Sequence, residues 1–188
     1  INWDVVLKTA ISDLEVDQRE VNSKLYYIKY KLENNDDFIT IATTRPETML
    51  GDTAVAVHPN DKRYKNKLGK NVILPIVGKK IKIIADVYAD PKQGSGAVKI
   101  TPAHDFNDYE VGKRNNLEII NILTEEGKIN ENAPNEYIGL DISEARKKIL
   151  NELSNNNLLV KEENIKNKIP YGDRSNSIIE PFLTEQWF

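Results

Sequence analysis

GSGAVKITPAHDFNDYEVGKR, the stretch from Gly94 to Arg114, predicts more of the fold than any other part of the chain. It indicates a glycine turn, a short strand over Ala97–Thr101, a proline break and a helix that opens at Asp105. Lys99 and Thr101 share one face of that strand, because side chains two residues apart point the same way. The pattern therefore predicts a polar site where the strand ends and the helix begins.

Two carboxylates occupy the start of the expected helix. Asp105 takes the N-cap position and Asp108 lies in the first turn. Acidic residues are favoured there by unpaired N–H groups and by the helix dipole, without any ligand. Asp105 therefore has a structural interpretation, whereas Asp108 faces the strand end and is freer to meet a cation. A ligand that carries an amine and a hydroxyl would suit this group.

The composition is that of an ordinary globular chain: of its 188 residues, 39% are hydrophobic and 29% are charged. This length suits a single domain with its own core. No apolar run approaches the roughly 18 residues of a membrane span, and no signal-peptide pattern opens the chain. The absence of cysteine excludes disulfides and thiolate sites and fits a cytoplasmic protein. A net charge of −3 does not indicate a nucleic-acid-binding surface.

Alternating apolar and polar residues predict many short strands on both sides of the central stretch. Besides Ala97–Thr101, the expected strands are Lys24–Leu32, Phe38–Thr43, Thr53–Val57, Val72–Leu74, Ile81–Ile84, Asn115–Leu123, Leu158–Lys161 and Ser177–Pro181. A short helix is expected from Pro46 to Leu50, and an amphipathic helix over Asp141–Leu153. The predicted fold class is α+β and rich in strand.

Neither a metal nor a cofactor is expected. His58 and His104, the two histidines, lie far apart in sequence and lack ligand spacing. A site built from His104, Asp105 and Asp108 is the weaker alternative. No G-x-S-x-G sequence marks a serine nucleophile, and Gly94–Gly96 lacks the Gly-Lys-Ser/Thr ending of a phosphate loop.

Several candidate residues also have an ordinary structural interpretation. Lys99 suits an exposed strand, Thr43 and Thr44 are good β-formers, and Arg45 suits a solvated surface. The basic run over residues 62–67 is typical of a solvent-exposed surface. Position in the sequence alone leaves these alternatives open.

Two long motifs resemble the editing insertion of valyl-tRNA synthetases. They are TTRPETMLGDTAVAVHPND, Thr43–Asp61, and the stretch Gly94–Arg114 quoted above. NWD at Asn2–Asp4 and the closing DRSNSIIEPFLTEQWF are similar to the places where that insertion leaves and rejoins the catalytic core. The resemblance covers essentially the whole chain. It implies the distorted, β-barrel-like editing domain of class I aminoacyl-tRNA synthetases, with a few peripheral helices.

The same resemblance implies a single editing domain over residues 1–188, with 1–10 and 180–188 as connections to the catalytic core. The HIGH and KMSKS motifs of ATP-dependent activation are absent from the chain, so we expect no tRNA charging. The implied partners are the rest of the synthetase and the 3′ end of valine tRNA carrying threonine. No membrane partner is expected.

The activity that the resemblance implies is post-transfer editing, the hydrolysis of threonine esterified to valine tRNA. A pocket fitted to valine cannot strongly reject a hydroxyl in place of a methyl, so a second site that binds the hydroxyl is needed. The ester is already activated, so positioned water and oxyanion stabilisation suffice without a covalent nucleophile. N–H groups near Phe106 and Asn107, with Lys99 or Arg45, are the expected donors. A substrate ribose hydroxyl is the expected acceptor of the water's proton.

The resemblance also assigns roles to individual residues. Asp108 holds the α-ammonium, while Lys99 and Thr101 lie near the hydroxyl and the carbonyl. Asp105 and His104 shape the turn into the helix, and Asp105 helps to order water. The substrate-binding residues beside the terminal adenosine and the ester are Thr43, Thr44, Arg45 and Thr48, and Asp90 is a weaker candidate for binding the hydroxyl.

Two alternatives stay open at this point. One is the editing domain of the related isoleucine or leucine enzyme, which carries a similar threonine-rich segment. The other is a non-catalytic module that binds tRNA or packs against the rest of a synthetase. The first differs in the misacylated tRNA that it cleaves, and the second cleaves none.

Overall fold

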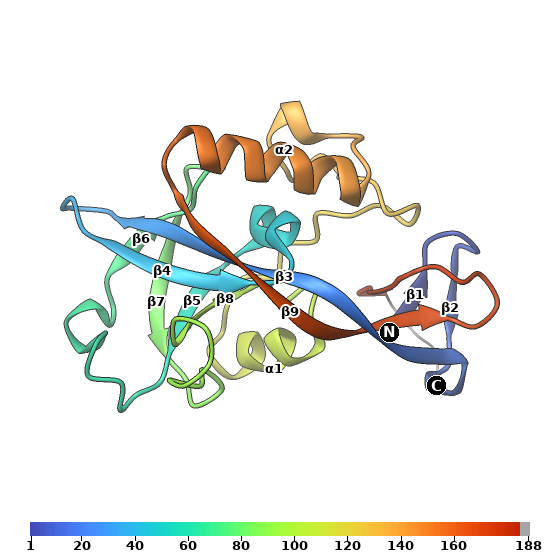
Figure 1. Ribbon diagram of the computed structural model, residues 1–188, viewed down its shortest axis with the longest axis horizontal. Helices are drawn as coiled ribbons and strands as arrows, with labels where there is room; N and C mark the ends of the chain where they lie inside the picture. The colour runs from blue at the N-terminus through green and yellow to red at the C-terminus, as the bar shows by residue number, and fades with distance from the viewer. Residues whose placement is uncertain (185–188) are drawn as a thin grey trace.

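The computed structural model describes residues 1–184, so the last four residues of the expected connection 180–188 lie outside the described part of the chain. Figure 1 shows a strand-rich body with a helix on each side and a small sheet at one end. The strands of the body are β3 (Val16–Leu32), β4 (Phe38–Thr43), β5 (Ala54–Val57), β6 (Asn71–Ile73), β7 (Lys80–Ala85), β8 (Ala97–Ile100) and β9 (Leu159–Gly172). The predicted α+β, strand-rich class is confirmed.

The body is one sheet curled around an interior. Its hydrogen-bonded order is β4–β3–β6–β7–β5–β8, and β9 pairs with β3. Neighbouring strands are antiparallel except for β5 and β7, which are parallel. The two end strands, β4 and β8, lie beside each other, and Ser95 Oγ donates to the Thr40 carbonyl at 2.5 Å near this gap. The result is an open barrel.

Alternation along β5 and β8 decides which side chains face the interior. Val55 and Val57 belong to the main core, whereas Ala54 and Ala56 pack in the small core under helix α1. Lys99 of β8 lies directly opposite Val55, so it shares the interior face and is only 5% exposed. A cation at such a position requires a charged or polar partner.

Helix α1 (Phe106–Arg114) follows β8 and covers the alanine side of β5. Its N-cap is Asp105, whose Oδ1 accepts from Asp108 N at 2.9 Å, as the sequence predicted. Val111 anchors the helix in the small core beside Ile100. The cap and this contact fix the direction in which the first turn leaves the strand.

Helix α2 (Ile142–Asn155) covers the opposite side of the body. Asp141 and Glu144 form a capping box at its start. Its expected apolar stripe is buried at Ala145, Ile149 and Leu153 and joins the main core. In the part of the chain that the structure describes, no helix is long and apolar enough to cross a membrane.

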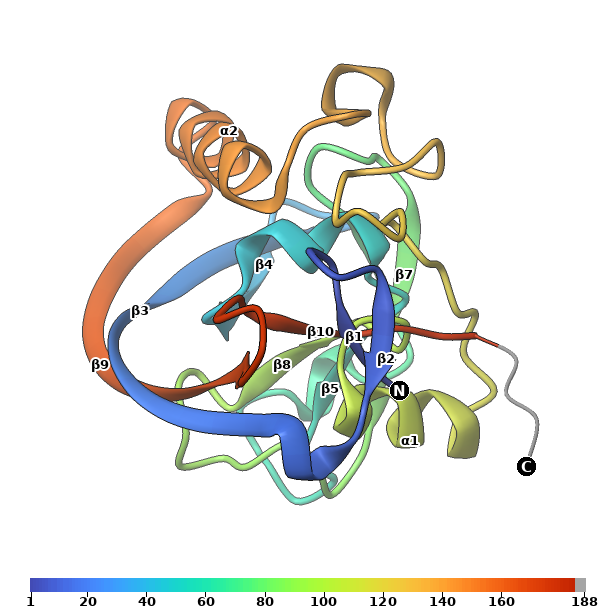
Figure 2. The same cartoon turned by 90° about the vertical axis from the view of Figure 1, so that its right-hand side faces the viewer.

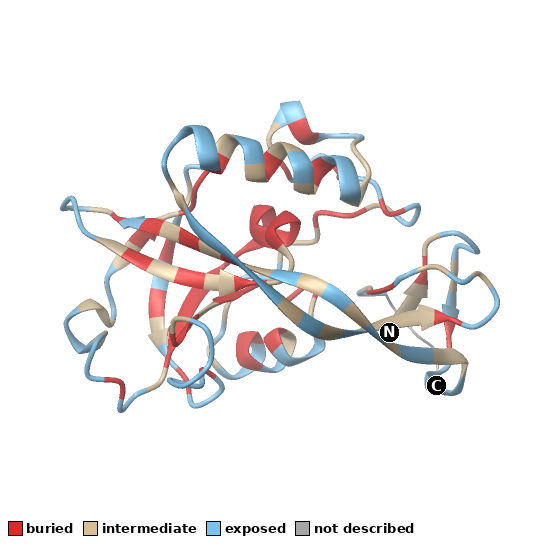
Figure 3. Cartoon of the chain, in the orientation of Figure 1, coloured by how far each residue is buried: buried red, intermediate tan, exposed pale blue. Residues whose placement is uncertain are grey.

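The N-terminal residues lie in the small sheet, in which β1 (Asn2–Asp4) pairs with both β2 (Thr9–Ile11) and β10 (Ile179–Pro181). From there β3 and β9 run to the body as a paired ribbon that curves around one side of the molecule (Figure 2). Figure 3 shows that the ribbon is exposed on its outer face, whereas the barrel interior is buried. The remaining elements are the 3₁₀ helices η1 (Asp13–Glu15), η2 (Pro46–Gly51), η3 (Lys65–Lys67) and η4 (Asn135–Tyr137).

Two predictions about strands need correction. Asn115–Leu123 is not a strand: it is an irregular segment with one isolated bridge at Leu123. The strand expected at Leu158–Lys161 extends to Gly172, because it pairs with β3 along almost its whole length. The helix expected after Pro46 is confirmed as η2, in 3₁₀ form.

Candidate functional site

A cavity of about 790 Å³ lies beside the ends of β4 and β8, where the β3–β9 ribbon passes. It is lined from η2, from the loop that precedes β8, from the start of α1 and from the ribbon. Ten residues that the sequence suggested for the site contribute to its wall: Thr43, Thr44, Arg45, Thr48, Asp90, Lys99, Thr101, His104, Asp105 and Asp108. Phe106 and Asn107, the expected backbone donors, line an adjoining cavity instead. The fold thus brings two distant motifs to one cavity.

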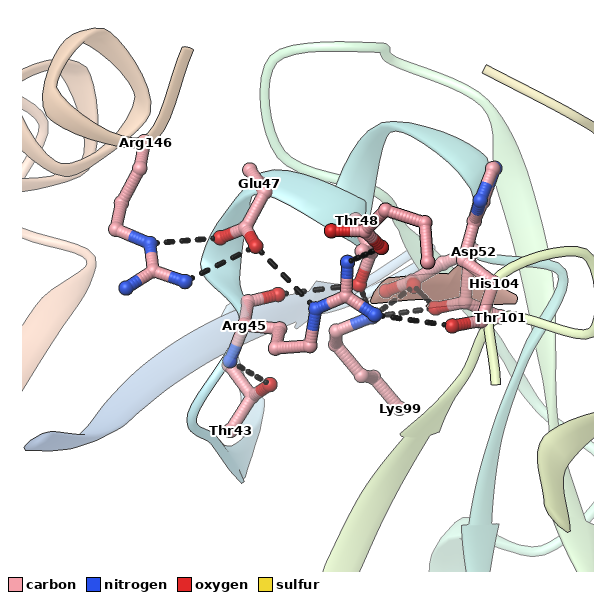
Figure 4. Close-up of polar contacts among 10 residues, drawn as sticks. Thr43, Arg45, Glu47, Thr48, Asp52, Lys99, Thr101, His104 and Arg146 are labelled. Atoms are coloured by element: carbon pink, nitrogen blue, oxygen red, sulfur yellow. Dashed lines mark hydrogen bonds and ion pairs between the residues drawn. The ribbon is translucent and has the colours of Figure 1, made fainter. Parts of the chain in front are cut away.

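The Lys99 ammonium is held by three oxygen acceptors (Figure 4). It donates to Thr48 Oγ1 at 2.6 Å, to Asp52 Oδ1 at 2.9 Å and to Thr101 Oγ1. An ammonium has three N–H donors, so this arrangement uses all of them. Lys99 is therefore fixed by the protein itself and orders the two threonine hydroxyls.

Asp52 is the buried counter-charge of this cluster. Its carboxylate is 1% exposed and also accepts from Tyr30 Oη at 2.7 Å and from Thr101 Oγ1 at 2.6 Å. Burial raises the pKa of Asp52, and the nearby Lys99 ammonium opposes that rise. Neither Asp52 nor Tyr30 lines the cavity. This pair therefore affects the cavity only through the residues of its wall that Asp52 contacts, Lys99 and Thr101.

The hydrogen bonds of the two threonines decide what they offer to a ligand. Thr101 gives its proton to Asp52, and Thr48 gives its proton to the Arg45 carbonyl at 3.1 Å. Both hydroxyls also accept from Lys99. A hydroxyl has one proton and two lone pairs, so each retains a lone pair. Toward the cavity they are hydrogen-bond acceptors.

Asp108 places a second acceptor group in the same cavity. Its Oδ2 accepts from Thr101 N at 2.9 Å, and the residue is 7% exposed. Burial raises the pKa of Asp108 to about 7, the neighbouring Asp105 adds to the rise, and Lys99 opposes it. Asp105 itself is occupied as the N-cap. The Asp108 carboxylate interacts with the hydroxyl of Tyr88, which also lines the cavity, so a ligand meets these two groups together.

Arg45 is held from three sides. Its Nη1 donates to the His104 carbonyl at 3.0 Å, its Nη2 to Glu180 Oε2 at 2.5 Å, and its Nε to Glu47 Oε1 at 3.4 Å. Burial works against its charge, but Glu180 and Glu47 outweigh this and raise the pKa of Arg45. Glu47 in turn accepts two bonds from Arg146 of α2. The arginine is therefore a fixed part of the wall.

The other residues that the sequence suggested lie at the rim or support the backbone. Thr43 Oγ1 accepts from Arg45 N at 3.0 Å and so fixes the turn into η2. Asp90 is exposed, and its Oδ1 accepts from Lys92 N at 2.9 Å. Thr44 lines the cavity from the same turn as Thr43.

His104 is buried, and its ring contacts the irregular segment 115–123 rather than the end of β8. Its Nε2 accepts from Ile122 N at 3.0 Å, so the ring proton belongs to Nδ1. Burial lowers the pKa of His104 to about 3, with Arg45 and Lys99 adding to the effect. The imidazole is therefore neutral at physiological pH, and its interaction with Ile122 is structural.

We expect His104→Ala to lower the free energy of unfolding by about 2–4 kcal/mol, because it creates a cavity and leaves Ile122 N unpaired. Urea unfolding measures this. His58→Ala is the control: His58 is half-buried and accepts from Asn60 N near the surface, so its loss costs about 1 kcal/mol or less. Equal losses in both variants would contradict the structural role of His104.

Sequence reasoning missed Asp52, Tyr30 and Glu47 as members of the site. Asp52 and Glu47 lie within the quoted motif Thr43–Asp61, but neither spacing nor charge distinguishes them there. The available signal was the strand pattern: Lys99 falls on the interior face of β8, and a buried lysine needs a carboxylate. Which carboxylate it meets depends on the tertiary fold.

Comparison with known proteins identifies the family. The profile for the leucyl-tRNA synthetase editing domain matches residues 66–165, just over half of the chain. The chain belongs to this editing-domain family. Valine–tRNA ligases of Pelagibacter ubique and Bdellovibrio bacteriovorus are 77% and 56% identical to it over all 188 residues. These matches make it an editing domain of the valyl-tRNA synthetase kind, as the sequence motifs predicted.

Solved structures agree on the fold of the editing domain. GlLeuRS-CP1 is similar with a TM-score of 0.60 and 14% identity, over 73% of this chain and 98% of that one. A LeuRS of Agrobacterium radiobacter K84, solved with tRNA and LeuAMS, gives a TM-score of 0.56 and 18% identity over 80% of this chain and 20% of that one. The editing domain spans about a fifth of the length of the curated relatives it matches.

Proposed function

We propose that this editing domain hydrolyses the ester of threonine mischarged onto valine tRNA. The observation that carries the proposal is the set of acceptors in one cavity: the Asp108 carboxylate and the lone pairs of Thr48 and Thr101. Threonine presents two donors, its α-ammonium and its hydroxyl. The carboxylate suits the ammonium and the threonines suit the hydroxyl.

The same arrangement explains how valine would be spared. Valine has a methyl group where threonine has a hydroxyl, so it would desolvate Thr48 and Thr101 without giving them a donor. Each threonine oxygen would keep its hydrogen bond from Lys99 but would leave its remaining lone pair without a donor, at a cost of up to about 1–3 kcal/mol. A site built to bind a hydroxyl can therefore reject a substrate that lacks one. In this mechanism Lys99 acts through the threonines that it orients.

Hydrolysis itself requires little from the protein, since the aminoacyl ester is an activated acyl group. Phe106 N and Asn107 N stand at the start of α1, where backbone N–H groups have no partner within the helix. These two residues line an adjoining cavity, whereas Arg45 lines both cavities, so Arg45 is the donor that the cavity of the acceptors offers to a developing oxyanion. Water attacks the acyl carbon and passes a proton to the neighbouring ribose hydroxyl. The bond from the acyl carbon to the ribose oxygen then breaks, and that oxygen takes up the relayed proton. The products are threonine and tRNA with free terminal hydroxyls, formed without a covalent enzyme intermediate.

The proposed partners are the 3′ end of valine tRNA and the remainder of a synthetase. The solved complex of the Agrobacterium enzyme contains tRNA, and the valine–tRNA ligase relatives are about five times longer than this chain. Both facts support these partners. Because the net charge is −3, we expect weak tRNA binding by the isolated domain.

A deacylation assay at high enzyme concentration tests the proposal. We expect release of threonine from threonyl-tRNA(Val) and little release of valine from valyl-tRNA(Val). Asp108→Ala should lower the rate about 100-fold or more, because the α-ammonium loses its carboxylate. Asp36→Asn, at an exposed turn, is the control and should not change it. Preference for valyl-tRNA would contradict the valine assignment, and no hydrolysis by the wild type would favour a non-catalytic module.

A further inference from the structure

Glu180 belongs to the small sheet but reaches the wall of the cavity. It lies in β10, is 4% exposed, and its Oε2 accepts from Arg45 Nη2 at 2.5 Å across 135 residues of sequence. Arg45 lines the candidate site, and both Arg45 and Glu180 line a second cavity of about 400 Å³ on the small-sheet side of the arginine. The carboxylate therefore connects the small sheet to the candidate site.

The guanidinium of Arg45 depends on this contact for its position. The other carboxylate within reach belongs to Glu47, and its Oε1 already accepts from Arg146 Nη2 at 3.0 Å. The bond from Arg45 Nε to that oxygen is long, at 3.4 Å. The His104 carbonyl holds Nη1 but carries no charge. Among the described residues, Glu180 is thus the partner that fixes the outer end of the guanidinium.

We propose that Glu180 is a positioning residue of the editing site, which acts on the substrate through Arg45. A guanidinium has five N–H donors, and three are used by Glu47, His104 and Glu180. The remaining two lie on the terminal nitrogens of a side chain that lines both cavities. Glu180 sets the direction in which they point. This inference rests on the proposed role of Arg45 at the ester or the terminal nucleotide.

A double-mutant cycle between Glu180 and Arg45 separates positioning from general stability. Glu180→Ala should lower kcat/KM for threonyl-tRNA(Val) about tenfold in the wild type and less than about twofold in Arg45→Ala. Glu180→Gln should lie between wild type and Glu180→Ala, because its amide oxygen still accepts from Arg45. All variants are assayed well below their melting temperatures.

Asp4→Asn is the matched control in the small sheet. Asp4 is a buried carboxylate of β1 that accepts from Val6 N and Leu7 N, both at 2.9 Å, and does not touch Arg45. It should lower the melting temperature but leave kcat/KM unchanged in both backgrounds. If Glu180→Ala lowers kcat/KM equally in both backgrounds, or in neither, Glu180 does not position Arg45.

Binding of a threonyl-adenosine with an amide in place of the ester gives the same cycle without hydrolysis. Glu180→Ala should raise its Kd about tenfold in the wild type and less than about twofold in Arg45→Ala. A wild type that binds this analogue but hydrolyses no tRNA contradicts the proposed function, and the Kd cycle then decides the role of Glu180. A wild type that does neither overturns both proposals.

Discussion

Asp108→Asn is expected to reduce threonyl-tRNA deacylation about 100-fold or more and, at the same time, to stabilise the editing domain above about pH 4, with the full gain reached above about pH 7. Activity falls because an amide cannot neutralise the α-ammonium of the substrate. Stability rises because the wild type must keep a carboxylate ionised in a buried position, where its pKa is raised to about 7. The amide oxygen still accepts from Thr101 N, so the fold keeps that hydrogen bond.

The pH window of the stabilisation follows from the two pKa values. The folded protein holds the Asp108 proton up to about pH 7, whereas the unfolded chain releases it near the ordinary value of 3.8. Asp108 therefore makes stability fall as the pH rises between these values. At pH 8 the gain of Asp108→Asn is on the order of 2–4 kcal/mol, and it vanishes at about pH 4. Urea unfolding at both pH values measures the difference.

The same ionisation predicts the pH dependence of the wild-type reaction. Since the carboxylate form binds the α-ammonium, kcat/KM should rise as the pH increases through about 7. A flat profile between pH 6 and 8 would contradict an Asp108 carboxyl that ionises near pH 7 in the folded protein. An Asp108→Asn variant less stable than the wild type at pH 8 would contradict a free-energy cost of the buried carboxylate. Asp36→Asn again serves as the exposed control.

Lys99→Ala is expected to lower the free energy of unfolding by about 3–5 kcal/mol, as is typical when one partner of a buried ion pair is removed. Asp52 would be left as a buried carboxylate without a counter-charge, and Thr48 and Thr101 would lose their common donor. Deacylation should fall as well, because the threonine lone pairs are no longer oriented. Chemical unfolding and the deacylation assay measure the two effects.

Two further variants test this explanation. Lys82→Ala removes an exposed lysine of β7 and should change stability by about 0.5 kcal/mol or less. Lys99→Met combined with Asp52→Asn removes both charges and should recover much of the stability lost in Lys99→Ala, but not the activity. If the double variant is no more stable than Lys99→Ala, the unpaired Asp52 carboxylate is not the cause of the loss.

The central strand, turn and helix were predictable because their signals are local. The alternation over Ala97–Thr101 and the cap at Asp105 depend on neighbours within a few residues. For the same reason the sequence indicated correctly that Lys99 and Thr101 share a face. The gathering of Thr43–Thr48 and Gly94–Arg114 around one cavity came from the resemblance to a known family, since no local pattern contains it.

The features that the sequence did not predict depend on contacts between residues that lie far apart in the sequence. Asn115–Leu123 contains enough apolar residues for a strand, but Ile122 N donates to the ring of His104 and the Asn121 carbonyl accepts from Asn130. The length of β9 is set by its pairing with β3, because its own sequence contains few apolar side chains and does not show the regular alternation of a strand. The Lys99–Asp52 pair likewise joins residues 47 positions apart.

The pairing of β3 with β9 also has a consequence for biosynthesis. Among the described strands, β9 is the one that pairs with residues 16–25, and it is translated about 140 residues later. At roughly 5–20 residues per second, that half of the strand waits for its partner for on the order of ten seconds on the ribosome. Its many polar side chains, among them Gln18, Asn22 and Lys24, discourage pairing with other nascent chains in that interval. The polarity of the ribbon thus protects an edge that must stay open during synthesis.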